Sequence, residues 1–216
     1  PAGLNNVERV YSNYYQFTAV LSDNTLRTWG DTYYPGGALP TGGVGNVKEV
    51  YPNEGCWAVV HQDNTCTVWG IPDKGGTAPS GLANVKTIYS GAWAYVAVHY
   101  DKTATVWGHP SYGGSGPSGG LNLNNVESVA SNYFAFAALH TDGSVTAWGD
   151  SSKGGSFPGG SSASVKALYA TMAAFTAINK DGTVTHAWGL AGYGAGNLPM
   201  GITNAESIVS NKYSFA

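Results

Sequence analysis

Residues 136–150 read FAALHTDGSVTAWGD, and this stretch decides the fold. An aromatic residue followed by small apolar residues is typical of a buried strand, and the Asp142-Gly143 pair is typical of a tight hairpin turn. Thr, Val and Ala then lead to Trp148, as in a second strand that pairs with the first. The stretch therefore predicts a β-hairpin that ends at Trp148-Gly149.

The same pattern occurs five times in the 216 residues, and each copy ends in Trp-Gly. Successive tryptophans are 40, 38, 41 and 40 residues apart, and a proline follows each after ten or eleven residues. This regular spacing identifies an internal repeat. We expect the repeated tryptophans to pack between units; they are Trp29, Trp69, Trp107, Trp148 and Trp188.

Each unit also has an earlier strand with two apolar residues three positions apart, as in Val126 and Val129. A three-stranded ribbon cannot bury its own apolar faces, so the copies must stack on one another, radially or linearly. The sequence predicts one all-β repeat domain over residues 1–216. Its units are approximately 4–43, 44–82, 83–122, 123–162, 163–201 and a partial unit, 202–216.

The composition excludes several classes of protein. The chain has 31 glycines, only 10 Lys or Arg and 13 Asp or Glu, and 12% aromatic residues, which favours packed strands over long helices or disorder. The chain has a formal net charge of −3, and its Lys and Arg residues do not form a clustered basic face. Nucleic acid is therefore not an expected partner. It has no long apolar run, so we expect no membrane insertion. A start at Pro1, without Met or a leader, is expected of a processed or excerpted segment.

Cys56 and Cys66 lie in one hairpin of the second unit. If this hairpin turns at Asp63-Asn64, His61 lies opposite Cys66 and strand alternation places Cys56 on the other face of the sheet. We therefore expect two small buried side chains, with a disulfide through a bulge as the alternative. The redox state stays open.

Two other residue types recur at fixed positions and raise the question of catalysis or metal binding. The repeated aspartates, which we interpret as turn residues, are Asp23, Asp63, Asp101, Asp142 and Asp181. The repeated histidines, which we interpret as solvent-facing strand residues, are His61, His99 and His140, whereas His109 and His186 stand alone. No nucleophile is paired with a base, so the sequence predicts no catalytic residue, metal site or cofactor.

Residues 136–150 resemble the RCC1-like repeat, whose signature is a small apolar strand, a D-G turn and W-G before a glycine-rich loop. This resemblance implies a β-propeller with blades of about 40 residues. The short period and the proline after Trp are similar to the secreted β-lactamase-inhibitory propellers. That type implies seven three-stranded blades that bind their target through aromatic loops before the second strand. Five and a half units allow a ring of five or six blades, or an open array completed by a neighbouring chain.

We expect the ligand to be bound by aromatic residues that are not part of the repeated core. They precede the second strands or follow Trp-Gly, and they are Tyr14, Tyr15, Trp93, Tyr133, Phe134, Tyr213, Tyr33, Tyr34, Tyr112 and Tyr193. Exposed Tyr and Trp provide large contact areas for proteins and sugars. Packing of the loops on themselves is the alternative interpretation.

The predicted function is a noncatalytic binding module for a protein or a carbohydrate, outside the cell or on its surface. A structural subunit of a homopolymer, joined through the incomplete terminal unit, and a proteinaceous enzyme inhibitor are the alternatives.

Overall fold

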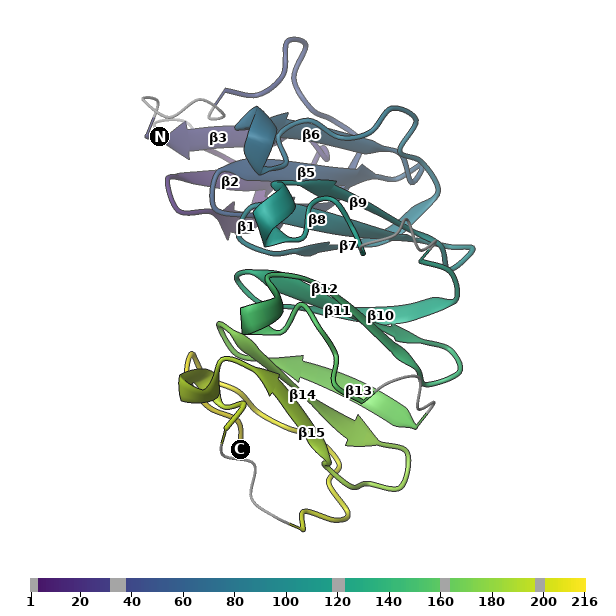
Figure 1. Cartoon of the computed structure of the whole chain (residues 1–216). Helices are drawn as coiled ribbons and strands as arrows, with labels where there is room; N and C mark the ends of the chain where they lie inside the picture. The colour runs from purple at the N-terminus through teal and green to yellow at the C-terminus, as the bar shows by residue number, and fades with distance from the viewer. Residues whose placement is uncertain (1–3, 32–37, 118–122, 160–163, 197–200) are drawn as a thin grey trace.

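The computed structural model describes residues 4–31, 38–117, 123–159, 164–196 and 201–216. Its strands form five three-stranded antiparallel sheets, here called blades 1 to 5, and each sheet is ordered as in the sequence (Figure 1). The strands are β1 (Val7–Ser12), β2 (Gln16–Leu21), β3 (Leu26–Gly30), β4 (Val47–Pro52), β5 (Cys56–His61), β6 (Cys66–Gly70), β7 (Val85–Ser90), β8 (Ala94–His99), β9 (Ala104–Gly108), β10 (Val126–Ser131), β11 (Ala135–His140), β12 (Val145–Gly149), β13 (Val165–Ala170), β14 (Ala174–Asn179) and β15 (His186–Gly189).

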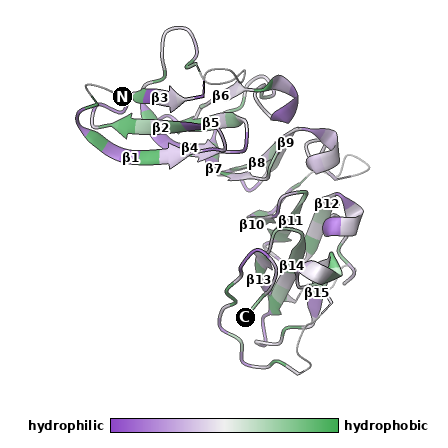
Figure 2. Ribbon diagram, turned by 90° about the vertical axis from the view of Figure 1, so that its left-hand side faces the viewer, coloured by the Kyte–Doolittle hydropathy of each residue, from purple (hydrophilic) through white to green (hydrophobic). Residues whose placement is uncertain are grey.

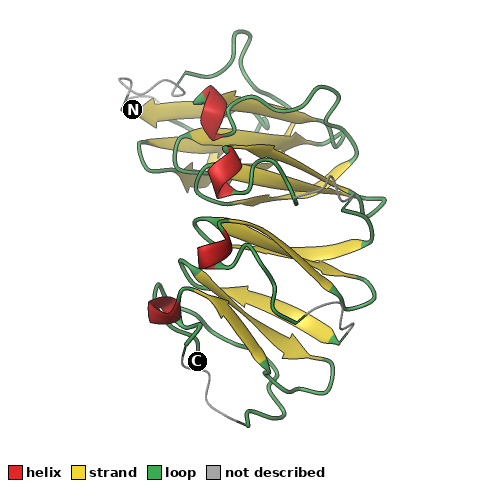
Figure 3. Ribbon diagram, in the orientation of Figure 1, coloured by secondary structure: helices red, strands yellow, loops and turns green. Residues whose placement is uncertain are grey.

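Short 3-10 helices follow the third strands of blades 2 to 5, in the loops where the sequence predicted no secondary structure. They are η1 (Pro72–Lys74), η2 (Pro110–Tyr112), η3 (Ser151–Lys153) and η4 (Ala191–Tyr193). Figure 3 shows the four turns in one column along the stack of sheets. The loops after Trp-Gly therefore gather at one edge of the molecule.

The hairpin that decided the fold forms as predicted. Phe136 pairs with Trp148 and Leu139 with Val145. The carboxylate of Asp142 accepts hydrogen bonds from the Ser144 backbone N–H (2.8 Å) and hydroxyl (2.7 Å), and Gly143 has φ +93°. The repeated aspartates thus hold the turns between second and third strands.

The five blades follow one another along an arc (Figures 1 and 2). First strands of neighbouring blades contact each other, β1 with β4, β4 with β7, β7 with β10 and β10 with β13, so these strands line the inside of the arc. Over the described residues, the sheets do not close into a ring. The all-β, propeller-type architecture of three-stranded blades is confirmed, in an open arrangement.

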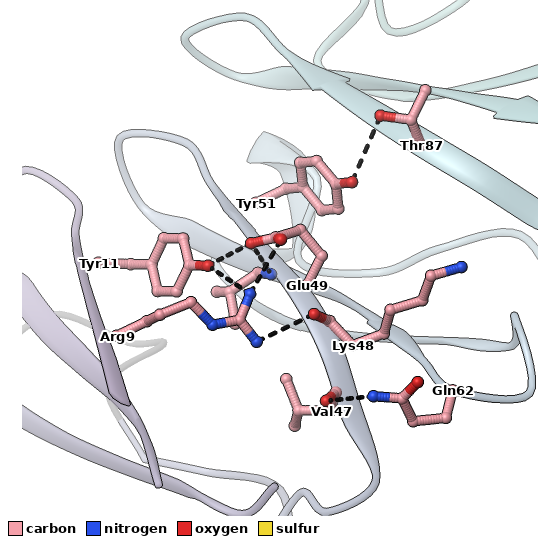
Figure 4. A network of polar contacts seen from close by, with 9 residues as sticks. Arg9, Tyr11, Val47, Lys48, Glu49, Tyr51, Gln62 and Thr87 are labelled. Carbon is pink, nitrogen blue, oxygen red and sulfur yellow. Dashed lines mark hydrogen bonds and ion pairs between the residues drawn. The ribbon is translucent and has the colours of Figure 1, made fainter. Parts of the chain in front are cut away.

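Polar contacts tie the first strands together along the inside (Figure 4). The Arg9 guanidinium contacts the Glu49 carboxylate at 2.9 Å, and the Tyr11 hydroxyl donates to the same carboxylate. Farther along, the hydroxyls of Tyr51 and Thr87 share a hydrogen bond of 3.3 Å. An ion pair and hydrogen bonds between side chains therefore join the first strands of blades 1, 2 and 3.

The apolar core lies between the blades. Trp148 stacks on Phe136 of its own sheet at 5.6 Å, and its indole N–H donates to the Gly113 carbonyl of blade 3 at 3.0 Å. Trp107 and Trp188 make the equivalent bonds. The repeated tryptophans of blades 2 to 5 are buried, whereas Trp29 is half-exposed.

The outer face of blade 1 shows what stacking contributes. Phe17 is 47% exposed, whereas its equivalent Phe136 is 0% exposed because blade 3 covers it. Val10 is likewise exposed and Val129 buried. Residues at the same repeat position are therefore buried when a preceding blade packs against their sheet and exposed when none does.

The partial sixth unit continues the repeat. Ser210 pairs with Phe215, and Val209 and Ala216 exchange backbone hydrogen bonds of 2.8 and 2.9 Å. In blade 5, Ala170 pairs with Phe175 at the corresponding position. Residues 209–216 thus form an isolated bridge in the register of the first and second strands, without forming strands of their own.

The cysteines require one correction. Cys66 pairs with Val60 rather than with His61, and Cys56 pairs with Gly70, so both thiols belong to the same face. The expected opposite faces were wrong because the hairpin loop is three residues long and shifts the register by one. Both cysteines are free, Cys56 buried and Cys66 half-buried, as expected of small apolar side chains.

Candidate binding surface

In blades 1, 2, 4 and 5, a side chain accepts hydrogen bonds from the backbone of the turn before the second strand, whereas blade 3 has Gly91 at this position. In blade 4, Asn132 Oδ1 accepts from the N–H groups of Phe134 (2.8 Å) and Ala135 (2.7 Å), and its Nδ2 donates to the Lys153 carbonyl at 2.8 Å. Asn53 does the same in blade 2, with a 2.8 Å bond to the Lys74 carbonyl. One asparagine therefore holds the tip of the turn beside the 3-10 helix of its blade.

Backbone hydrogen bonds also run from one tip to the next. Glu54 N–H donates to Ala92 at 3.2 Å, Tyr133 N–H to Met172 at 3.1 Å, and Met172 N–H to Lys212 at 3.2 Å. These bonds join the tips of blades 2 and 3, of blades 4 and 5, and of blade 5 and the sixth unit. Blades 3 and 4 meet at this edge through ring contacts such as that of Tyr112 with Phe134.

Four aromatic side chains of blades 3 and 4, Trp93, Tyr112, Tyr133 and Phe134, meet at this edge, and we call them the aromatic rim. Trp93 lies 4.2 Å from Tyr112 between ring centroids, and Tyr112 stacks on Phe134 at 5.7 Å. Tyr133 contacts Phe134 at 4.7 Å. All four are half-buried, so part of each ring faces solvent.

Charged groups surround these rings. Lys74 Nζ lies 4.0 Å from the Trp93 ring centre, and Lys153 Nζ lies 4.3 Å from that of Phe134. The Trp93 indole donates to the Glu54 carboxylate at 2.8 Å. Burial and the same carboxylate raise the pKa of the Tyr133 hydroxyl well above its usual range. Because Lys153 also forms an ion pair with the Asp150 carboxylate, the apolar surface is combined with two cations and two anions.

The other predicted binding residues form separate groups. Tyr14 and Tyr15 contact each other at 5.2 Å at the tip of blade 1, and Tyr14 is highly exposed. Tyr193 and Tyr213 pair at 5.2 Å near the sixth unit. Tyr33 and Tyr34 lie outside the described residues. The structure thus brings together the middle four of the ten predicted side chains.

Four residues of this surface were missed by the sequence prediction: Lys74, Lys153, Glu54 and His109. Lys74 and Lys153 each precede a Gly-Gly pair after Trp-Gly, and this shared position was the available signal. His109, predicted to stand alone, lies 5.4 Å from both Trp93 and Tyr112. Its ring nitrogen also accepts from the Ser111 N–H at 3.2 Å, at the start of η2.

The strand histidines connect parts of their blades; His99 is buried, which contradicts the prediction of a solvent-facing residue, whereas His61 and His140 are partly exposed. His140 Nδ1 donates to the Asn124 carbonyl at 2.8 Å, and its Nε2 accepts from the Thr146 hydroxyl at 2.8 Å. His61 and His99 repeat both bonds, and His99 is buried. Each imidazole thus fastens the start of a blade to its third strand, a role that the sequence pattern did not indicate.

Within the described ranges, no group of three or more His, Cys, Asp or Glu side chains is placed to hold a metal ion. No helix in the same ranges is long and apolar enough to cross a membrane.

The pattern that recurs in every blade matches a known family. The model of the regulator of chromosome condensation (RCC1) repeat matches residues 126–154, which comprise blade 4 and its η3 turn. Blade 4 is therefore similar to the RCC1 repeat. The RCC1-like strand order and Trp-Gly ending recur in the other four sheets. The search of curated proteins found no match to this sequence.

Solved structures share this RCC1-like fold at low sequence identity. Prp20p from Saccharomyces cerevisiae has a TM-score of 0.59 and 17% identity over 92% of this chain and 62% of its own. The ectodomain of the receptor kinase CR4 from Physcomitrella patens has a TM-score of 0.55 and 15% identity over 88% of this chain and 52% of its own. Human WBSCR16 has a TM-score of 0.55 and 14% identity over 85% of this chain and 61% of its own. The chain therefore spans about three fifths of the length of Prp20p.

Proposed function

We propose that this chain is a noncatalytic protein-binding module whose contact surface is the aromatic rim of blades 3 and 4. The observation that carries the proposal is the contiguity of Trp93, Tyr112, Tyr133 and Phe134 between Lys74, Glu54 and Lys153.

The physical argument rests on preorganisation. Tyr and Trp provide large contact areas and lose little conformational entropy on binding, which is why they are enriched at the energetic centres of interfaces. Here the Asn132 side chain holds the turn that carries Tyr133 and Phe134. The hydrogen bond from the Glu54 N–H to the Ala92 carbonyl joins the turn that carries Trp93 to blade 2. A partner that offers apolar side chains and a carboxylate near the lysines fits this surface.

The comparisons support a protein as the partner. Structures of Prp20p describe its binding to Gsp1p and histones and its complex with Kap60. Because identity is 17%, the fold alone is shared, and those partners belong to Prp20p. A carbohydrate ligand, an enzyme target as in the inhibitory propellers, and a place outside the cell or on its surface stay predictions.

A structural subunit is the second candidate, and the open arc supports it. The exposed outer face of blade 1, with Phe17 and Val10, has the composition of the faces that are buried inside the stack. Two copies that stack end to end would bury this face, as blades 2 to 5 do within one chain.

The test compares two variants for binding to an array of purified extracellular and intracellular proteins and to a glycan array. The double variant Trp93→Ala/Tyr112→Ala removes the centre of the rim, and Tyr100→Ala removes an exposed tyrosine at the end of β8. We expect the double variant to weaken protein binding by tenfold or more, consistent with about 1.4 kcal/mol for each factor of ten, and Tyr100→Ala to leave it unchanged.

Equal loss in both variants, or binding of glycans alone, would contradict this proposal. Mass measurement by light scattering decides between the two candidates, since a monomer at all concentrations removes the structural subunit.

A further inference from the structure

The Glu54 side chain reaches from blade 2 to aromatic residues of the next two blades. Its carboxylate accepts the indole N–H of Trp93, in blade 3, at 2.8 Å. Burial, followed by hydrogen bonding and charge from Glu54, raises the pKa of the Tyr133 hydroxyl in blade 4, so this hydroxyl also lies beside the carboxylate. One side chain therefore connects three blades at the aromatic rim.

The bond between Trp93 and Glu54 ends on a charged group. The other indole bonds of the described residues end on neutral groups, namely the backbone carbonyls of Gly75, Gly113 and Gly154 and the amide oxygen of Gln16. A hydrogen bond to a carboxylate is shorter and stronger than one to a neutral acceptor. Trp93, which is half-buried, is thus held at the surface by a stronger bond than those of the buried indoles.

This bond sets the direction in which the indole points. Lys74 Nζ lies 4.0 Å from the centre of the Trp93 ring, and the Tyr112 ring lies 4.2 Å away between centroids. A cation near an aromatic face is attracted over a range of orientations, so these contacts leave the direction of the N–H undetermined. The bond to Glu54 is directional and supplies it.

The repeat does not require a carboxylate at this position. The first residues of the tips differ in every unit, and they are Tyr14, Glu54, Ala92, Tyr133, Met172 and Lys212. The tip of blade 2 is held by the Asn53 side chain and by the bond from the Glu54 backbone N–H to the Ala92 carbonyl. The turn is therefore held without the Glu54 side chain.

We propose that Glu54 is a positioning residue of the aromatic rim, whose carboxylate holds the Trp93 indole and the Tyr133 hydroxyl in the arrangement that receives a protein partner. Because the arrangement already exists in the free chain, a partner meets side chains whose rotamers are fixed, and binding loses less conformational entropy. The consequence for binding rests on the proposed function, whereas the arrangement itself does not.

NMR of the full 216-residue chain tests the arrangement without a partner. The seven tryptophans give seven indole signals in a proton–nitrogen correlation spectrum, and the signal that is missing in Trp93→Phe belongs to Trp93. In Glu54→Ala we expect this signal to move and its exchange with solvent to become about tenfold faster or more, because a bond to a charged acceptor is lost. The other six signals should stay in place.

Two further variants separate positioning from support of the fold. Glu54→Gln keeps an acceptor oxygen for the indole, so exchange of the Trp93 signal should accelerate less than in Glu54→Ala. Met172→Ala is the matched control, because Met172 is half-buried at the same repeat position in blade 5, and it should leave the Trp93 signal unchanged. The urea midpoint of Glu54→Ala should equal that of the wild type, since the turn does not depend on this side chain.

An unchanged Trp93 signal in Glu54→Ala overturns the inference. Movement of all seven signals, or a lowered urea midpoint, in that variant also overturns it, because Glu54 would then support the fold rather than the rim.

Binding supplies the second measurement. For a protein that the wild-type chain binds on the array, Glu54→Ala should weaken affinity about tenfold, as loss of preorganisation at a central anchor does. Equal affinity of Glu54→Ala and wild type would show that the rim does not need this carboxylate, which overturns the inference. An array without any bound protein contradicts the proposed function alone, since the indole signal of Trp93 still decides whether Glu54 positions it.

Discussion

The indole of Trp188 in blade 5 donates a 3.0 Å hydrogen bond to the carbonyl of Gly154 in blade 4. Gly154 has φ +102°, where a side chain would be strained, and an added Cβ would also meet the Phe175 ring at 2.6 Å. The absence of a side chain at Gly154 therefore leaves room for the Phe175 ring and the Trp188 indole of the next blade.

This contact predicts the cost of removing the indole. Trp188→Ala should lower the free energy of unfolding by about 3–5 kcal/mol, through lost burial and an unpaired carbonyl. Trp29→Ala should cost less, because Trp29 is half-exposed at the open end of the stack. Urea unfolding followed by circular dichroism measures both, and equal losses would show that stacking between blades does not determine the energetics.

The imidazole of His140 predicts a second effect on stability. His140→Ala breaks the bonds to the Asn124 carbonyl and the Thr146 hydroxyl and should cost about 1–3 kcal/mol. His140→Asn should cost less, since Asn179 occupies this position in blade 5 and bonds Thr185 at 2.8 Å. Thermal unfolding of the two variants is the measurement. A solvent-facing histidine would give no loss in either.

The strands and hairpins could be predicted because their signals are local. Alternation in residues 136–150 fixes which side chains face the core, and the residue after each turn aspartate has positive φ, as in Asn64 (+63°) and Gly143 (+93°). The packing role of Trp148 followed from recurrence, since a side chain repeated in every unit makes the same contact in every interface.

The binding surface was less predictable because its contacts join residues about 20 to 40 positions apart. Lys74 lies over Trp93 only because η1 and the tip of blade 3 meet at one edge, and no periodicity marks a 3-10 helix. Similarly, the bond between His140 and the carbonyl of Asn124 depends on how the chain enters the blade. The register error at Cys66 arose from a loop one residue longer than expected.

The turn aspartates predict a loss of stability in acid. Hydrogen bonds from the Ser144 backbone N–H and hydroxyl lower the pKa of Asp142 below its ordinary value of 3.8. The folded state therefore favours the ionised form, so this stabilisation is present above pH 3.8 and is lost as pH falls through the lower folded-state pKa.

Unfolding in urea at pH 7 and pH 3 tests this dependence in the wild type and in Asp142→Asn. Asparagine keeps an acceptor oxygen but does not titrate, so the variant should lose less stability on acidification than the wild type does. Parallel losses in the two proteins would assign the acid sensitivity to other groups. The same sign is expected at the other four turn aspartates, whose pKa values are also lowered.

The thiols of the two cysteines should react slowly with alkylating reagents in the folded chain. Burial raises the pKa of both thiols to about 12, so the reactive thiolate is scarce at neutral pH. Cys56 Sγ also donates to the Ile71 carbonyl at 3.2 Å. Labelling with iodoacetamide at pH 8 should therefore be slow, and it should reach both thiols quickly once urea unfolds the chain. Fast labelling of Cys56 without urea would mean that blades 2 and 3 separate readily, because its side chain lies in the core between them.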